Sequence, residues 1–439
     1  MRGRALHILL AILLSTVLLV PGAAMAGTGD MEREYLLDFG GALPGDAEAL
    51  VLRAGGTLKE TLPDIGVVVA SSRDRQFSNR AQGNAEVQSV VADRLVNWLG
   101  PNDRIQAIDA TTASSQQAAD FYYLADGWNI KRVGGTPKGA WAIEKGNHSA
   151  KVAVMDTGVY AAHPDIAPNY LFGRSFVPGE DENDYNGHGT FVAGIIAGAL
   201  GGGAVVGVGP GLGLVNYKVL DAQGNGKWSW LLRAIYQSAA DGVTVANLSL
   251  GGPVDLTTRD GQKLWRLFQR AADHATKRGV LLVAAGMNNA IDFQDPAQSR
   301  YRYIPVQLDG VIGVSATTKQ DKLAFYSSYG RGVIDLAGPG GDLGPGYPAS
   351  SDRSYLITSS ASPKAPAGSL YGHGAGTSFA APHVAAAAGL LAVEVDGLRL
   401  KQIAARLEAS ADDLGPRGYD GFFGYGLVDA TKALKRVDN

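Results

Sequence analysis

The pattern of apolar and polar positions changes along the chain. From residue 151 onward, short runs rich in Val, Leu and Ala alternate with longer segments whose apolar residues recur at helical spacing. The short runs predict buried strands and the longer segments predict helices. The predicted strands are 151–155, 214–219, 244–248, 280–284 and 311–314, and the predicted helices are 190–199, 228–240, 263–278, 378–393 and 400–409.

This alternation of strands and helices predicts an α/β fold. Strands that are separated by helices form parallel sheets, and strands that are apolar throughout are buried on both faces. We therefore expect a mainly parallel sheet with helices on both faces. Functional groups in such sheets gather at the carboxyl ends of the strands, so the residues that follow each strand are the first candidates for chemistry.

A smaller unit is predicted ahead of this sheet. Strand-like runs at 35–39 and 65–70 flank a helical segment at 45–55, which is typical of a small α/β unit. A helix is also predicted for 87–99, and an exposed linker for roughly 105–120 because that stretch is polar. These features divide the chain into residues 1–26, 27–118 and 119–439.

The first segment, residues 1–26, has the pattern of a secretory signal peptide. Two arginines precede an apolar run that ends at Val20, and an Ala-x-Ala cleavage motif follows at 24–26. The run is shorter than the roughly 20 residues that a spanning helix needs, which disfavours a permanent anchor. We expect the segment to be removed, leaving a secreted protein without a membrane segment.

Composition narrows the classes of function. The chain has 439 residues, a net charge of −3 and no cysteine. The near-neutral charge gives no electrostatic footprint for nucleic acid, and the lack of cysteine excludes disulfides, thiolate metal sites and a cysteine nucleophile. Neither an H-E-x-x-H zinc motif nor a complete nucleotide-binding glycine motif occurs, which disfavours metallohydrolases and nucleotide-binding proteins.

Three residues that could act together lie at predicted strand ends or helix starts. Asp156 directly follows a strand, His188 lies between two glycines at the start of a helix, and Ser378 begins another helix. Each also has a structural explanation, with Asp156 and His188 as turn residues and Ser378 as a helix N-cap. Together they could supply a serine nucleophile, the base that takes its proton and the carboxylate that orients the base.

The sequences around these residues resemble those of the subtilisin-like (subtilase) serine peptidases. The matching motifs are Asp-Thr-Gly at 156–158, Asn-Gly-His-Gly-Thr at 186–190, Gly-Thr-Ser at 376–378 and Ala-Pro-His at 381–383. Their order along the chain is the one already known for subtilisin. The resemblance covers roughly residues 120–437 and implies a serine endopeptidase, with Asp156 as orienter, His188 as general base and Ser378 as nucleophile.

The resemblance also implies a substrate site. Ser249, Leu250 and Gly251 are similar to the strand that pairs with the backbone of a peptide substrate. The segment 281–286 is similar to the strand that leads to the oxyanion asparagine, but Met287 stands where the family has that asparagine. Either Asn288 serves instead, shifted by one residue, or backbone N–H groups stabilise the oxyanion alone.

No cofactor is expected for catalysis, whereas the resemblance raises the question of a structural calcium ion. Asp165 matches a calcium ligand of the family, but the stretch 200–205 offers no side-chain oxygen where related enzymes have an asparagine. A calcium site here would depend on backbone carbonyl groups. The polar run 180–184 could hold a cation or form a solvated loop.

The unit at 27–118 resembles the propeptides of the family, which assist folding and inhibit the enzyme until they are removed. We therefore expect a monomeric, secreted endopeptidase that acts on proteins or peptides, with its own propeptide as an intramolecular inhibitor and no nucleic-acid partner. The alternative is a secreted pseudo-peptidase that binds peptides without cleaving them, which Met287 favours and the intact set of Asp156, His188 and Ser378 disfavours.

Overall fold

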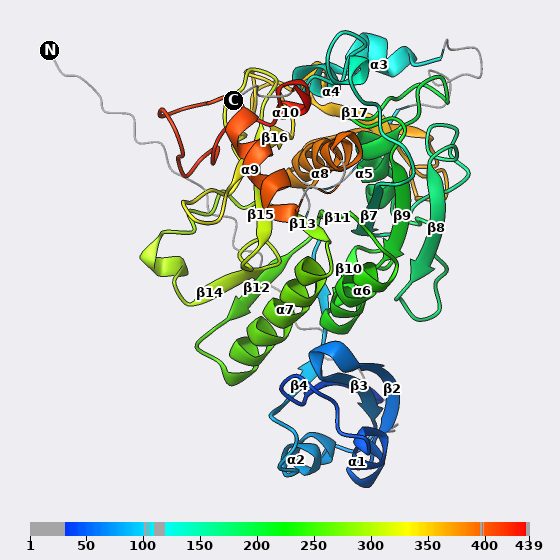
Figure 1. Ribbon diagram of the computed structural model, residues 1–439, viewed down its shortest axis with the longest axis vertical. Helices are drawn as coiled ribbons and strands as arrows, with labels where there is room; N and C mark the ends of the chain where they lie inside the picture. The colour runs from blue at the N-terminus through cyan, green and yellow to red at the C-terminus, as the bar shows by residue number, and fades with distance from the viewer. Residues whose placement is uncertain are drawn as a thin grey trace, which may run out of the picture.

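The computed structural model describes residues 31–100, 103, 105–108, 119–395, 397 and 399–435. The expected signal peptide and residues 109–118 of the expected linker lie outside these ranges. In Figure 1 the N-terminal unit, in blue, lies at one end of a larger unit that holds the remaining helices and strands. Within the described ranges, no helix combines the length and apolar character needed to cross a membrane.

Seven parallel strands form the central sheet, in the order β16-β15-β13-β11-β7-β9-β8. The five predicted strands are confirmed. The two edge strands were not predicted, because β8 is only half-buried and β16 is a short run that contains glycine and proline. The strands are β7 (Lys151–Asp156), β8 (Tyr170–Ser175), β9 (Gly213–Lys218), β11 (Val245–Leu248), β13 (Leu281–Ala285), β15 (Val311–Thr317) and β16 (Leu336–Pro339).

Alternate residues of the strands face two different helical layers. In β7, Val152 and Val154 belong to the core beneath α5 and α8, whereas Ala153 and Met155 belong to the core beneath α6 and α7. This alternation buries both faces and confirms the predicted α/β fold with helices on both faces (Figure 1). The helices are α5 (His188–Ala197), α6 (Trp228–Ala240), α7 (Arg259–Lys277), α8 (Thr377–Glu394), α9 (Leu400–Ser410) and α10 (Ala430–Leu434).

Shorter elements lie around this sheet. The helices α3 (Phe121–Asp126) and α4 (Trp128–Arg132) begin the larger unit. Small antiparallel ladders pair β12 with β14, β10 with β5, and β18 with both β17 and β6. Their bounds are β5 (Leu95–Asn97), β6 (Gln106–Ala107), β10 (Asn225–Lys227), β12 (Gly252–Asp255), β14 (Tyr301–Ile304), β17 (Ile357–Ser360) and β18 (Tyr371–Gly374).

The N-terminal unit is a four-stranded antiparallel sheet with two helices, as its α/β pattern predicted. The strand order is β2-β3-β1-β4. The predicted helix at 87–99 is wrong, because Val90 and Val91 lie in a strand that pairs with β1 and leads into β5. Pairing with a distant strand overrides the local helical pattern. The elements are β1 (Arg33–Asp38), α1 (Ala47–Arg53), β2 (Thr57–Leu62), β3 (Val67–Ser72), α2 (Phe77–Gln82) and β4 (Ser89–Asp93).

The N-terminal sheet packs on the larger unit through its second face. Tyr35 and Leu37 of β1 contact the core under α1 and α2, while Leu36 belongs to the core shared with α6 and α7. Charged pairs surround this contact, including Glu34 with Lys227 at 2.7 Å. Further pairs across the interface include Asp38–Arg270, Glu60–Arg233 and Asp64–Arg278.

Of the described residues in the expected exposed linker, Gln106 and Ala119 are exposed, whereas Ile108 is buried. After β4, the chain adds β5 to β10, and further on it adds β6 to β18. Between these ladders Asp103 is 7% exposed, and directly after β6 Ile108 is buried against the larger unit. The described parts of this stretch therefore pair with strands of the larger unit.

Candidate active site

Asp156 and His188 form a buried, hydrogen-bonded pair. Asp156 is the last residue of β7 and His188 is the first residue of α5, so the end of a strand faces the start of a helix. Nδ1 of His188 lies 2.8 Å from Oδ1 of Asp156, and both side chains are fully buried. The same oxygen accepts the N–H of Thr157 at 2.7 Å. This is the geometry of a carboxylate that orients an imidazole.

Opposing effects set the protonation of His188. Burial disfavours the charged ring, but the nearby carboxylates of Asp156, Asp103 and Asp184 outweigh it and raise the pKa of His188 above its ordinary value. Among the described residues, no group forms a hydrogen bond with Nε2 of His188. One ring nitrogen is thus fixed by Asp156, and the other is available to a reacting group.

The buried carboxylate of Asp184 holds the helix that carries His188. Its Oδ2 accepts the N–H and the hydroxyl of Thr190 at 2.9 and 2.7 Å. Its Oδ1 accepts the N–H of Gly187 at 2.7 Å and the hydroxyl of Thr157 at 2.9 Å. A single carboxylate therefore binds the start of α5, where negative charge is favourable, and ties it to the end of β7.

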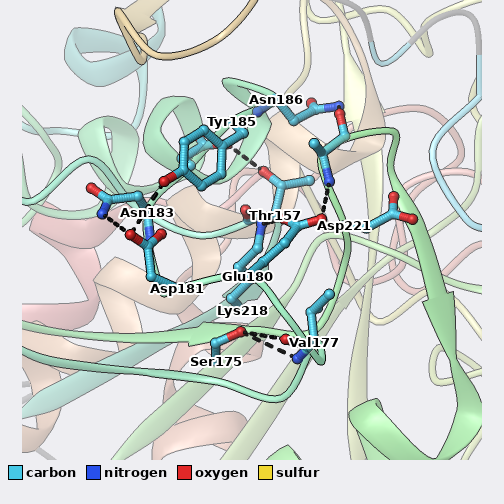
Figure 2. A network of polar contacts seen from close by, with 12 residues as sticks. Thr157, Ser175, Val177, Glu180, Asp181, Asn183, Tyr185, Asn186, Lys218 and Asp221 are labelled. Atoms are coloured by element: carbon cyan, nitrogen blue, oxygen red, sulfur yellow. Dashed lines mark hydrogen bonds and ion pairs between the residues drawn. The ribbon is translucent and has the colours of Figure 1, made fainter.

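A second network around buried Lys218 supports the same turn (Figure 2). The ammonium group of Lys218 donates to the carbonyl oxygen of Thr157 and forms an ion pair with Glu180 at 3.0 Å. Asp181 instead accepts the hydroxyl of Tyr185 at 3.2 Å. Within the described ranges, no group of three or more acidic or histidine side chains could hold a metal ion. The polar run 180–184 is not a fully solvated loop, because Glu180 pairs with Lys218 and Asp184 is buried.

Ser378 lies beside this pair, at the start of α8. It is the second helical residue, and Gly376 rather than Ser378 is the N-cap, so the capping explanation for this serine is wrong. Its buried hydroxyl lies 3.0 Å from Oδ1 of Asp103 and 3.2 Å from the carbonyl oxygen of Ser249. The ring of the next residue, Phe379, is centred 5.3 Å from that of His188.

The side chain of Asn288 contacts both the start of α8 and Asp103. Its Oδ1 accepts the N–H and the hydroxyl of Thr377, both at 2.8 Å, and its Nδ2 donates to Oδ1 of Asp103 at 2.7 Å. Met287 has a φ of 72°, a left-handed conformation that is uncommon for residues other than glycine. This local turn brings the side chain of Asn288, one position later, to the start of α8.

Sequence reasoning missed Asp103, which contacts both Ser378 and Asn288. Burial raises the pKa of Asp103, although the charge of His188 opposes the shift. The N–H of Gly100 donates to its Oδ2 at 2.8 Å. The sequence carries no signal for these contacts, because a single aspartate in a polar stretch is common and the Ser378 contact spans 275 positions.

The residues expected to bind substrate lie at the carboxyl end of β11. The hydroxyl of Ser249 donates to the carbonyl oxygen of Ser378 at 2.6 Å. Leu250 and Gly251, together with Met287, line a cavity of about 70 Å³ next to Ser378. The structure therefore brings all three expected residues to the candidate site.

The strand β10 is also part of the candidate site, although sequence reasoning did not identify it. β5 adds to β10 in antiparallel register, and the N–H of Trp98 donates to the carbonyl oxygen of Gly224 at 3.2 Å. Trp98 also packs its ring 5.0 Å from that of Trp228. Gly224 and Gly226 were the sequence signal that could have indicated this close pairing. A Cβ at Gly226 would lie 3.0 Å from the Trp98 ring. Strand addition of this kind recognises a peptide through its backbone.

The surroundings of Asp165 do not fit a calcium ion. Its Oδ2 accepts the N–H of Val205 at 3.3 Å and the hydroxyl of Ser360 at 3.2 Å, and burial raises its pKa to about 7. Calcium requires six to eight oxygen ligands, whereas an N–H group cannot be a ligand. The adjacent glycine loop is instead held by Asp120, whose Oδ1 accepts the N–H of Gly201 at 2.8 Å.

Comparison with known proteins identifies the family of the chain. The model of the subtilase family matches residues 147–426. Subtilisin BL from Lederbergia lenta is 35% identical over 311 residues, which are 70% of this chain and 98% of the relative. A thermophilic serine proteinase from Bacillus sp. (strain AK1) is 31% identical over 382 residues, 85% of this chain and 83% of the relative.

Solved structures show the same fold. A lanthipeptide protease is 29% identical with a TM-score of 0.63, covering 70% of this chain and 93% of the other. The epidermin leader peptide processing serine protease of Staphylococcus aureus has a TM-score of 0.77 at 21% identity, covering 93% of this chain and 100% of the other. The motifs, the fold and the relatives agree: the chain belongs to the subtilase family and is a serine-type endopeptidase.

Proposed function

We propose that the chain is a secreted endopeptidase made as a self-processed zymogen, with Asp156, His188 and Ser378 as its catalytic triad. The observation that carries this proposal is the buried 2.8 Å contact between Asp156 and Nδ1 of His188. Ser378 and Asn288 converge on the same carboxylate oxygen next to this pair. Secretion is supported by the signal-like pattern of residues 1–26.

The proposed reaction is acyl transfer to Ser378. The hydroxyl oxygen of Ser378 attacks the carbonyl carbon of a peptide bond while Nε2 of His188 takes the hydroxyl proton. Asp156 keeps the imidazole in orientation through Nδ1. Nδ2 of Asn288 and the backbone N–H of Ser378 stabilise the oxyanion. His188 then returns the proton to the leaving amine, and water releases the acyl-enzyme by the same route.

The N-terminal unit is proposed to be a propeptide that the enzyme removes itself. Its sheet covers α6 and α7, and its last strand, β5, occupies the peptide-binding edge of β10. A chain that already lies in the binding groove both inhibits the enzyme and presents itself for cleavage. Detachment would then free β10 for protein substrates.

Covalent labelling tests the nucleophile. A fluorophosphonate reacts with serines that a neighbouring base activates, so the processed protein should be labelled and Ser378→Ala should lose at least 99% of the label, or about a hundredfold. Ser351→Ala removes an exposed serine and should leave labelling unchanged. A correctly folded, processed protein that takes no label would overturn the peptidase and favour the alternative pseudo-peptidase.

The same substitution tests self-processing. The Ser378→Ala chain, produced in a host that lacks other proteases, should remain at full length while the unaltered chain is shortened. Cleavage of the Ser378→Ala chain near the end of the N-terminal unit under these conditions would show that another enzyme processes it.

A further inference from the structure

Asp103 places its carboxyl group where the proposed reaction requires the carbonyl oxygen of a substrate. Its Oδ1 accepts the hydroxyl of Ser378 at 3.0 Å and the amide of Asn288 at 2.7 Å. These are the proposed nucleophile and the proposed oxyanion donor. The carboxylate therefore occupies both groups at once, and at 7% exposure it is shielded from water.

The backbone on either side holds this side chain in place. On one side, β5 pairs with β10 and the N–H of Gly100 donates to Oδ2 of Asp103 at 2.8 Å. On the other side, β6 pairs with β18, the strand that leads into α8. Two ladders and a local hydrogen bond thus direct Asp103 toward Ser378.

A carboxylate at this position cannot acylate Ser378 under ordinary conditions. Its charge is delocalised over two oxygens, so its carbon is a poor electrophile compared with that of a peptide bond. It also accepts the proton of the Ser378 hydroxyl as a hydrogen bond, which leaves Nε2 of His188 without that partner. In addition, its charge favours the protonated imidazole, and a protonated imidazole cannot act as a base.

We propose that the side chain of Asp103 is an inhibitory ligand that keeps the uncut chain inactive by binding Ser378 and Asn288 together. This role rests on the proposed function of Ser378 as nucleophile. Asp103 acts before any cleavage, as part of the intact chain, and must leave the site before a peptide carbonyl can enter. The rate of self-processing is therefore limited by the release of this side chain.

The rate of self-processing of the full chain tests this inhibitory contact. Asp103→Ala removes every contact of the carboxylate, and we expect the full-length chain to disappear about 10- to 100-fold faster, the range for lost hydrogen bonds to a charged group. Asp103→Asn keeps an acceptor oxygen without the charge and should give an intermediate rate. Rates are measured at several dilutions, so that cleavage between molecules is separated from cleavage within one.

A matched control removes a carboxylate elsewhere in the N-terminal unit. Asp46→Asn alters an exposed residue that pairs with Arg53 on the same helix, and it should process at the rate of the unaltered chain.

A second measurement does not depend on processing. In the uncut Ser378→Ala chain, NMR titration of His188 should show a lower pKa when Asp103→Asn is added.

Two results would overturn the role of Asp103. If Asp103→Asn and Asp103→Ala are processed at the unaltered rate, Asp103 does not inhibit the uncut chain. If they are processed more slowly, Asp103 takes part in the reaction. In the folded Ser378→Ala chain, a His188 pKa that Asp103→Asn leaves unchanged would also contradict it. Failure of the proposed function would give a different result from failure of the Asp103 role. The processed enzyme would then take no fluorophosphonate label, whichever residue occupies position 103.

Discussion

At the scale of single residues, the candidate site depends on one unusual backbone conformation. Met287 adopts φ 72°, which costs of order 1 kcal/mol or more for a residue with a side chain. This conformation lets Asn288 bridge Thr377 and Asp103. Sequence alone left Asn288 and the backbone N–H groups as alternative oxyanion donors, and the contacts of Asn288 favour the side chain.

Replacement of Asn288 tests this residue. Asn288→Ala in the processed enzyme should lower kcat by about 10²–10³-fold, the loss measured for the equivalent donor of subtilisin, while KM changes little. The reason is that this hydrogen bond forms with the oxyanion rather than with the bound substrate. Steady-state kinetics on a peptide substrate measures both constants.

The matched control for Asn288 is Asn147→Ala. Asn147 lies in an exposed turn just before β7, at the opposite end of this strand from Asp156. Its replacement should leave kcat unaltered. A kcat for Asn288→Ala within about threefold of the unaltered enzyme would assign the oxyanion to backbone donors instead.

At the scale of elements, the site is made where the end of β7 meets the start of α5. Asp184 links these two elements through four hydrogen bonds to Thr157, Gly187 and Thr190. Lys218 adds a contact from the end of β9. The sequence predicted both elements, but it predicted neither the junction nor the buried position of Asp184, because the junction consists of contacts between separate segments.

Removal of Asp184 should therefore affect stability and catalysis together. Asp184→Ala leaves several buried donors without an acceptor, and the free energy of unfolding should fall by about 3 kcal/mol. Urea unfolding in the Ser378→Ala background measures this without self-digestion. In the active enzyme, kcat should fall more than KM rises, because His188 loses its fixed position.

Asp181→Ala is the matched control for Asp184. Asp181 lies in the same loop, but it accepts hydrogen bonds from Asn183 and Tyr185 in an exposed setting. Its replacement should change the free energy of unfolding by less than about 0.5 kcal/mol. Equal losses in the two variants would show that Asp184 has no special part in joining β7 to α5.

At the scale of the whole molecule, two units are joined by an apolar face with charged groups around it. Asp93 ends β4 and accepts the N–H of Ser229 at the start of α6, at 3.3 Å. Burial raises its pKa to about 6, against an ordinary value of 3.8, although the hydrogen bonds from Ser229 oppose the shift. The joined state therefore favours the protonated carboxyl group more than the separated state does.

This shift predicts that the processed N-terminal unit dissociates more readily as the pH rises. Below the ordinary pKa, Asp93 is protonated in both states and contributes no penalty. Between about pH 4 and 6 the separated state loses its proton first, so the affinity should fall by about 100-fold across this interval and then level off. Native electrophoresis of the processed complex at a series of pH values measures the fraction that stays joined.

Asp93→Asn should remove this pH dependence, because the amide does not titrate in the interval. Asp74→Asn, at an exposed residue paired with Arg80, should retain it. If the complexes with Asp93 and with Asn at that position dissociate with the same pH profile, another group at the interface controls the separation.

The sequence by itself determined the elements whose pattern is local. Continuous apolar runs specified the five inner strands, helical spacing specified the covering helices, and three short motifs specified Asp156, His188 and Ser378. These features could be predicted because each is written within a few neighbouring residues. The edge strands β8 and β16 and the strands at 89–97 could not, because pairing with distant strands decided them.

Only the tertiary structure decided which distant groups meet. It brought Asp103 to Ser378 and Asn288, directed β5 to β10, and turned one face of the N-terminal sheet onto α6 and α7. Such contacts depend on the packing of whole elements, and an isolated aspartate or a short strand carries no periodic signal of its partner. The sequence therefore determined the candidate catalytic residues, and the packing decided which distant residues lie next to them.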